Sequence, residues 1–171
     1  MKRLLIVAVL AIVAVPAALA VPPAGDQSAS QLCKEQRNSM GMANFRALYA
    51  PTGSPKAAMN ACLAKQVTVA STAAKNAAKE CKAEQASLGD EAFNAKYGTN
   101  ANKKNAFGKC VSGTAAELKD EHQEATLNAA KKCKAERSLG VTAFNAKYGT
   151  NANKKNAFGK CVSATASSEA S

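Results

Sequence analysis

The chain has 171 residues, of which 47% are hydrophobic and 5% aromatic, and its 23 basic and 12 acidic side chains give a formal charge of +11. It contains six cysteines but a single histidine, and no C-x-x-C pair. These features argue against a zinc site, and the absence of a recurring acid pair argues against an enzyme. We therefore expect no catalytic residue, no metal and no cofactor.

Residues 1–20 have the three parts of a secretory signal. Lys2 and Arg3 precede the apolar run 4–15, and the small-residue site Ala18-Leu19-Ala20 follows. The apolar run is about a dozen residues long, too short to span a bilayer, which needs about 20. We expect cleavage after Ala20 and a secreted protein, extracellular or in the cell envelope, with a formal charge of +9 and no transmembrane segment.

The remaining sequence is repetitive. The block AFNAKYGTNANKKNAFGKCVS occurs unchanged at residues 92–112 and 143–163, and a degraded copy lies at 44–64. Each copy has one cysteine before the block and one inside it, which in an exported chain indicates disulfides. Spacings of 29, 29 and 28 residues predict one disulfide in each copy. The predicted pairs are Cys33 with Cys62, Cys81 with Cys110, and Cys133 with Cys161.

This repeat predicts an all-α array of three small disulfide-stapled modules. They are module 1 (33–64, degenerate), module 2 (81–112) and module 3 (133–163). Alanine-rich helical linkers are expected at 65–80 and 113–132, and flexible segments at 21–32 and 164–171. Each module should contain the end of a long helix, a glycine turn, a short Phe/Tyr helix, an asparagine-rich loop and a final short helix.

Apolar residues recur at matching positions of the three copies and are the expected module cores. In module 2, Phe93 and Tyr97 share one face of the short helix, and Gly98 is expected to end that helix as a left-handed cap. The third copy lacks one residue before Leu139, so its disulfide is expected to absorb a rotation of about 100°. The expected core residues are Met40, Phe45, Tyr49 and Met59 in module 1, Leu88, Phe93, Tyr97 and Phe107 in module 2, and Leu139, Phe144, Tyr148 and Phe158 in module 3.

The two linkers have helical patterns. The first presents an apolar seam, and the second begins with Thr114-Ala115-Ala116-Glu117, which is typical of a capping box. His122 in the second linker is expected to be an ordinary helix-surface or seam residue. The predicted seam consists of Leu63, Val67, Ala70, Ala74, Ala77 and Cys81.

The asparagine-rich loops at 99–105 and 150–156 allow two interpretations. They could contact a ligand through amide and basic groups, or the asparagines could cap the last helix, for which Asn102 and Asn105 are suited. The candidate loop contacts or caps are Asn100, Asn102, Asn105, Asn151, Asn153 and Asn156.

Each identical block also carries four lysines and no acid, a pattern that favours anion binding, although lysines can equally serve solubility alone. The candidate anion-binding residues are Lys96, Lys103, Lys104, Lys109, Lys147, Lys154, Lys155 and Lys160.

The motif C-K-A-E at 81–84 and 133–136, followed by the repeated block, resembles a segment found in one or several copies in exported bacterial repeat proteins of actinobacterial type. Modules 2 and 3 match closely, whereas module 1 departs at 50–55. The resemblance implies export and modularity and transfers no functional residue.

Two functions follow as hypotheses. The first is a secreted, non-enzymatic binding protein whose tandem basic modules contact an anionic polymer, such as a cell-wall polymer, a polysaccharide or extracellular nucleic acid. The alternative is a structural spacer or protein-interaction repeat in which the lysines serve only solubility. Membrane disruption would need a wider apolar face than the alanine seam offers.

Overall fold

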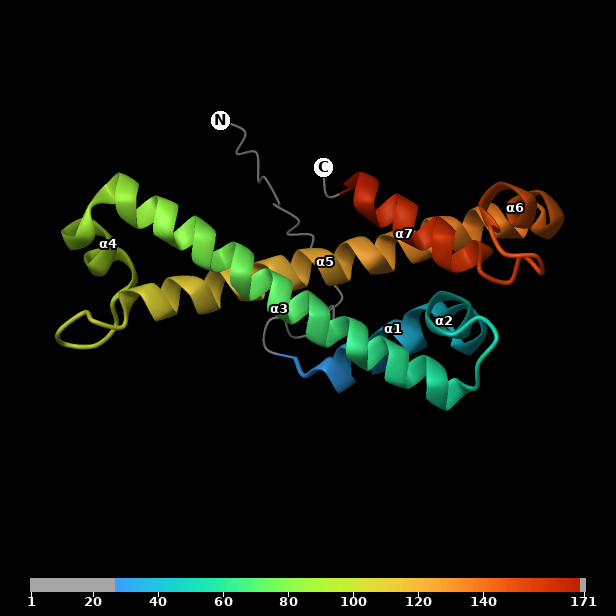
Figure 1. Cartoon of the computed structure of the whole chain (residues 1–171), viewed down its shortest axis with the longest axis horizontal. Coiled ribbons are helices and arrows are strands. Elements are labelled where there is room, and N and C mark those ends of the chain that lie inside the picture. The colour runs from blue at the N-terminus through green and yellow to red at the C-terminus, as the bar shows by residue number, and fades with distance from the viewer. Residues whose placement is uncertain (1–26, 170–171) are drawn as a thin grey trace, which may run out of the picture.

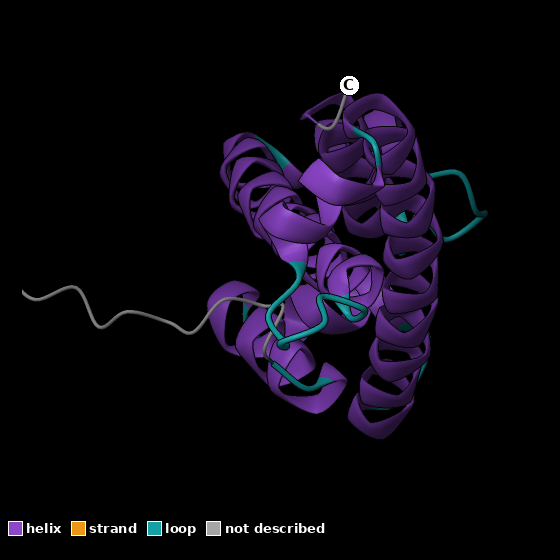
Figure 2. Cartoon of the chain, turned by 90° about the vertical axis from the view of Figure 1, so that its left-hand side faces the viewer, coloured by secondary structure: helices purple, strands orange, loops and turns teal. Residues whose placement is uncertain are grey.

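The computed structural model describes residues 27–169, and this part of the chain contains helices and loops but no strand (Figures 1 and 2). The predicted all-α class is confirmed. None of the helices within 27–169 is both long and apolar enough to cross a membrane. The predicted signal at 1–20 lies outside the described residues. The helices are α1 (Ala29–Met40), α2 (Met42–Tyr49), α3 (Pro55–Leu88), α4 (Asp90–Tyr97), α5 (Ala106–Leu139), α6 (Val141–Tyr148) and α7 (Ala157–Glu169).

Two long helices, α3 and α5, form the axis of the molecule. Each has 34 residues, and they run side by side in opposite directions, with α4 between them at one end (Figure 1). The predicted linkers 65–80 and 113–132 are the middle parts of these continuous helices. Helix α1 begins at Ala29 and α7 ends at Glu169, so helix extends into both segments that were expected to be flexible.

The predicted capping box at 114–117 is wrong, because α5 has already begun at Ala106. No proline lies between Cys110 and Thr114, and the helix continues through Ser112 and Gly113, so the short helix and the linker form one element. Inside α5, the Thr114 side chain has a different contact: its hydroxyl oxygen lies 3.8 Å from Cys81 Sγ.

The apolar seam predicted for α3 is confirmed only in part, since Ala77 and Cys81 are buried and Leu63 is partly buried, whereas its other residues are exposed. Val67 is 65% exposed, and Ala70 and Ala74 are also exposed. The disulfides decide the rotation of the helix, because Cys62 is tied to α1 and Cys81 to α5, so residues four positions from each cysteine face inward. The buried residues of α3 are Ala58, Cys62, Gln66, Ala73, Ala77 and Cys81.

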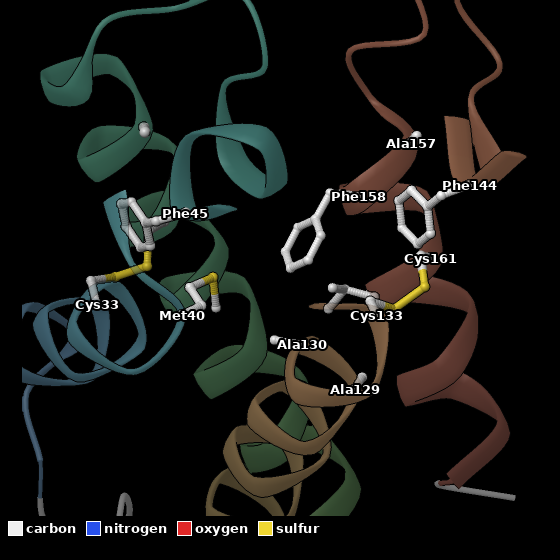
Figure 3. Close-up of a cluster of buried hydrophobic side chains, with 13 residues drawn as sticks. Cys33, Met40, Phe45, Ala129, Ala130, Cys133, Phe144, Ala157, Phe158 and Cys161 are labelled. Atoms are coloured by element: carbon white, nitrogen blue, oxygen red, sulfur yellow. A yellow bond between two sulfur atoms is a disulfide. The ribbon is translucent and has the colours of Figure 1, made fainter. Parts of the chain in front are cut away.

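Modules 1 and 3 lie side by side at one end of the α3/α5 pair, and module 2 lies at the other end (Figure 1). Modules 1 and 3 share one core of 13 buried residues with the middle of α5, shown in Figure 3. The core of module 2 contains only Cys81, Phe93, Ala106 and Cys110. Modules 1 and 3 therefore stabilise each other, whereas module 2 is stabilised by contacts within its own small core.

The predicted disulfide pairing is confirmed, and the Cα atoms of each pair are 6.0 Å apart. Module 3 is one residue shorter than module 2, and the turn between α5 and α6 accommodates this difference, not the Cys133–Cys161 disulfide as predicted. The Gly89 N–H donates to Gln85 O, four residues earlier, whereas the Gly140 N–H donates to Arg137 O, three residues earlier. Leu139, which directly precedes this tighter turn, is 89% exposed.

Three expected core residues are exposed, and four others are partly buried, namely Tyr49, Met59, Tyr97 and Tyr148. Leu88, Leu139 and Phe107 are exposed, because no other element covers the turns after α3 and α5 or the start of α5. Their counterparts Met40 and Phe158 are buried because module 1 packs on α5 and module 3 packs on module 1. Burial at these positions is therefore decided by neighbouring modules.

Candidate functional site

In each asparagine-rich loop, a lysine side chain donates a hydrogen bond to the backbone carbonyl of the glycine that precedes the loop. Gly98 has φ −71, so the predicted left-handed cap is wrong. Glycine is needed there for close approach, since a Cβ would lie 2.6 Å from Asn94 O and 2.8 Å from Lys103 Cβ. Lys103 itself adopts the left-handed region (φ 56), and its Nζ donates to Gly98 O at 2.7 Å. Lys154 makes the same bond to Gly149 O at 2.8 Å in module 3.

Asn105 is the N-cap residue of α5, but its side chain bonds the loop and not the helix. Its Oδ1 accepts hydrogen bonds from the backbone N–H groups of Thr99 and Asn100, and its Nδ2 donates to Thr99 Oγ1 at 2.7 Å. It occupies the position before α5 but makes no side-chain capping bond. Asn102 Oδ1 accepts from the Lys104 N–H, which is a local turn. The prediction that Asn105 starts the helix is therefore confirmed, but side-chain capping by Asn102 or Asn105 is wrong.

Module 3 repeats this network residue for residue. Asn156 Oδ1 accepts hydrogen bonds from the Thr150 and Asn151 N–H groups, and its Nδ2 donates to Thr150 Oγ1. Asn153 Oδ1 accepts from the Lys155 N–H. Because the same sequence gives the same bonds in two surroundings, the loop conformation is encoded locally.

We expect the double change Asn105→Ser and Asn156→Ser to destabilise each loop by about 1 kcal/mol, because serine cannot accept from two N–H groups and also donate through an amide. The matched change Asn102→Ser and Asn153→Ser should be nearly neutral, since a hydroxyl can make the same local turn. Urea unfolding of both variants measures the difference. Equal losses would contradict the assigned role of Asn105.

Lys96 is held by a charged cluster that connects α4 to the end of α3. Its Nζ lies 2.6 Å from Glu84 Oε1 and 4.9 Å from the centre of the Tyr97 ring, and the Tyr97 hydroxyl donates to Glu84 Oε2 at 2.7 Å. These bonds lower the pKa of Glu84 and raise that of Lys96, with the Lys96–Glu84 hydrogen bond as the largest cause. Lys96 is therefore engaged within the module.

The corresponding cluster in module 3 joins Lys147, Glu136 and Tyr148, with a Lys147–Glu136 distance of 2.8 Å. Sequence reasoning did not assign a role to Glu84 or Glu136. The signal was present, because C-K-A-E places a glutamate three residues after the first cysteine in both copies.

Four of the eight candidate anion-binding lysines are therefore occupied within their own modules, namely Lys96, Lys103, Lys147 and Lys154. The other four are exposed, and their side chains make no ion pair or hydrogen bond with any residue of 27–169. They flank the starts of α5 and α7. These four are Lys104, Lys109, Lys155 and Lys160.

Module 1 has a neutral version of the charged cluster. Gln36 stands at the position of Glu84, and Leu48 at the position of Lys96. The Tyr49 hydroxyl donates to Gln36 Oε1, and Gln36 Nε2 donates to Gln123 Oε1 on α5. Burial raises the pKa of Tyr49 to about 12, although its hydrogen bond with Gln36 acts in the opposite direction. Without charges, this face can be buried in the shared core.

A groove of about 370 Å³ lies where α2, α3, α5 and α7 meet, and Lys65 and His122 line it. His122 is half-buried, and its Nδ1 is buried without a hydrogen-bond partner. Burial lowers the pKa of His122, and the positive charge of Lys65 lowers it further. The histidine is thus a seam residue that favours its neutral form.

Because the pKa of His122 is lower in the folded state than its ordinary value of 6.5, the unfolded chain binds the proton more readily. Stability contributed by neutral His122 is therefore present above pH 6.5 and is lost as the pH falls towards the folded pKa. We expect the melting temperature to decline over this range in the native protein but to stay flatter in His122→Gln. Thermal melts at a series of pH values measure this, and parallel curves would contradict it.

No protein-family model, curated protein or solved structure matches the chain. The resemblance suggested by the repeated block therefore remains a prediction.

Proposed function

We propose that this protein is a secreted, non-enzymatic binding protein whose modules 2 and 3 contact an anionic polymer. The proposal rests on one observation: half of the lysines in the two repeated blocks are bonded within their own module, and the other half are not. Lys104 and Lys109 remain exposed and unpaired in module 2, as do Lys155 and Lys160 in module 3, while the others stabilise their own modules. The free lysines provide two equivalent basic surfaces.

The start of α5 supports the same proposal. Lys104 and Lys109 flank this helix N-terminus, where Asn105 provides no side-chain capping bond. The Ala106 N–H donates to Lys103 O, but the helix dipole and a first turn without a side-chain cap favour anions at such a position, and the two lysines add full charges. Sulfate, phosphate or carboxylate groups along a polymer are chemically suited to it.

The two surfaces lie at opposite ends of the molecule (Figure 1). A helix of 34 residues, such as α5, is about 50 Å long. One extended polymer could contact both ends, and the second contact would then gain from effective concentration even if each contact is weak. This spacing favours a polymer over a small anion.

The test is the salt concentration at which the protein elutes from immobilised heparin, used as a sulfated polymer. We expect the change of Lys104, Lys109, Lys155 and Lys160 to glutamine to lower that concentration strongly and to reduce the salt dependence of binding. The matched control changes Lys75, Lys79, Lys131 and Lys134, which are also exposed, and removes the same charge. It should retain most of the binding.

Equal effects of the two variants would show that only total charge matters. If the native protein is not retained at low salt, the alternative function as a spacer or protein-interaction repeat is favoured, with the lysines serving solubility.

A further inference from the structure

The identical blocks of modules 2 and 3 expose the same face to different extents. Phe158 is 2% exposed, whereas its counterpart Phe107 is 40% exposed. Val162 is buried, whereas Val111 is only partly buried. Since the sequences of the two blocks are the same, the difference comes from what covers each face.

In module 3 this face is covered by α2 of module 1. A Cβ on Gly159 would lie 3.1 Å from Ala47 O and 3.3 Å from Leu48 O, so the two backbones approach closely over the glycine. Figure 3 shows the Phe158 ring directed into the core shared with module 1. At the same position of module 2, a Cβ on Gly108 would meet nothing within 4 Å.

Helix α2 differs from the other two short helices at several positions, and one of them, Leu48, lies against Gly159 of α7. The corresponding residues of α4 and α6 are Lys96 and Lys147, which are held in ion pairs. Docking an apolar phenylalanine face against either would bury those charges, which is costly. Among the three short helices α2, α4 and α6, α2 is therefore the one that fits this face.

We infer that the Phe107 face of module 2, formed by Phe107, Gly108 and Val111, is a docking surface for α2 of a second copy of this chain. The identical residues of module 3 already make this contact within one chain, which defines the occupant and its geometry. Within one chain, module 3 already occupies α2. The contact between chains can therefore form only when α2 separates from module 3 of its own chain. The inference is independent of binding to an anionic polymer.

The position of the modules determines the kind of assembly. Module 2 lies at one end of the molecule and α2 at the other (Figure 1). A contact between two different surfaces at opposite ends is heterologous, and it extends copies head to tail. Association should therefore continue beyond a dimer as concentration increases.

The experiment measures the mass of full-length variants by sedimentation over a range of concentrations. Two variants release α2 from module 3: Gly159→Gln, which places a side chain against α2, and the same change combined with Phe158→Ser. We expect their weight-average mass to rise to at least twice that of the monomer, while the native protein stays largely monomeric. Hydrogen exchange in α2 should be faster than in the native protein at low concentration, which verifies release.

Two further changes test the surfaces themselves, each added to both release variants. Gly108→Gln places a side chain on the Phe107 face at a position where a Cβ meets nothing within 4 Å, and Leu48→Lys gives α2 the residue of the other short helices. Either change should restore the monomer. Monomeric behaviour of both release variants at all concentrations would overturn the inference, as would association that persists in the presence of Gly108→Gln or Leu48→Lys.

Discussion

Replacing Cys81 and Cys110 together with alanine is expected to unfold module 2 while modules 1 and 3 keep their structure. Closing a loop of this length stabilises the folded state by about 3.5 kcal/mol on chain-entropy grounds. The remaining core of module 2 is very small, because both cysteines belong to its four-residue cluster. Burial alone rarely stabilises a unit of this size.

The matched variant removes Cys33 and Cys62 from module 1. It loses the same loop constraint, but its neighbours remain in the 13-residue core shared with module 3. We expect this module to be destabilised and yet folded. Hydrogen exchange measured by mass spectrometry separates the two cases, by comparing peptides from 90–105 with peptides from 42–54. Slow exchange in module 2 after loss of its disulfide would contradict the expectation.

Phe158→Ala is expected to cost about 3 to 4 kcal/mol of unfolding free energy, because it removes a fully buried ring and leaves a cavity between two modules. Phe107→Ala should cost about 1 kcal/mol, since that ring is 40% exposed and its aromatic contact is with Phe93, at 6.5 Å between ring centres. The two changes are made in identical sequence surroundings, so each serves as the control for the other.

Urea unfolding of the two phenylalanine variants measures the difference directly. Equal losses would mean that module 3 is not docked on module 1. A larger loss in Phe107→Ala would mean that module 2 has a covering partner in solution.

Several features of the protein could be predicted from the sequence because they depend on residues close in the chain or on equal spacing. The disulfide pairs followed from cysteine spacing. The pairing of Phe93 with Tyr97, and of Phe144 with Tyr148, followed from their positions four residues apart, and the ring centres lie 5.0 and 4.9 Å apart. The helical class followed from periodicity in the same way.

The candidate site was only partly predictable. The lysines were identified, but which of them are free depends on specific bonds, such as those of Lys103 to Gly98 O and Lys96 to Glu84. The asparagines were interpreted as ligand contacts or helix caps, but the Asn105 side chain bonds residues six and five positions earlier and does not cap the helix. The residue types indicated which interactions these side chains could make, and the three-dimensional structure showed which residue each side chain bonds.

The sequence by itself determined the three disulfides and the Phe/Tyr pairs of the short helices, because each depends on spacing within one stretch of chain. Only the tertiary structure decided which modules share a core. Phe107 and Phe158 have identical neighbours along the chain, so no local rule can distinguish them, yet one is exposed and the other buried. The difference arises because burial is a property of the surface that packs against a residue, and for Phe158 that surface is α2, more than 100 residues earlier in the chain.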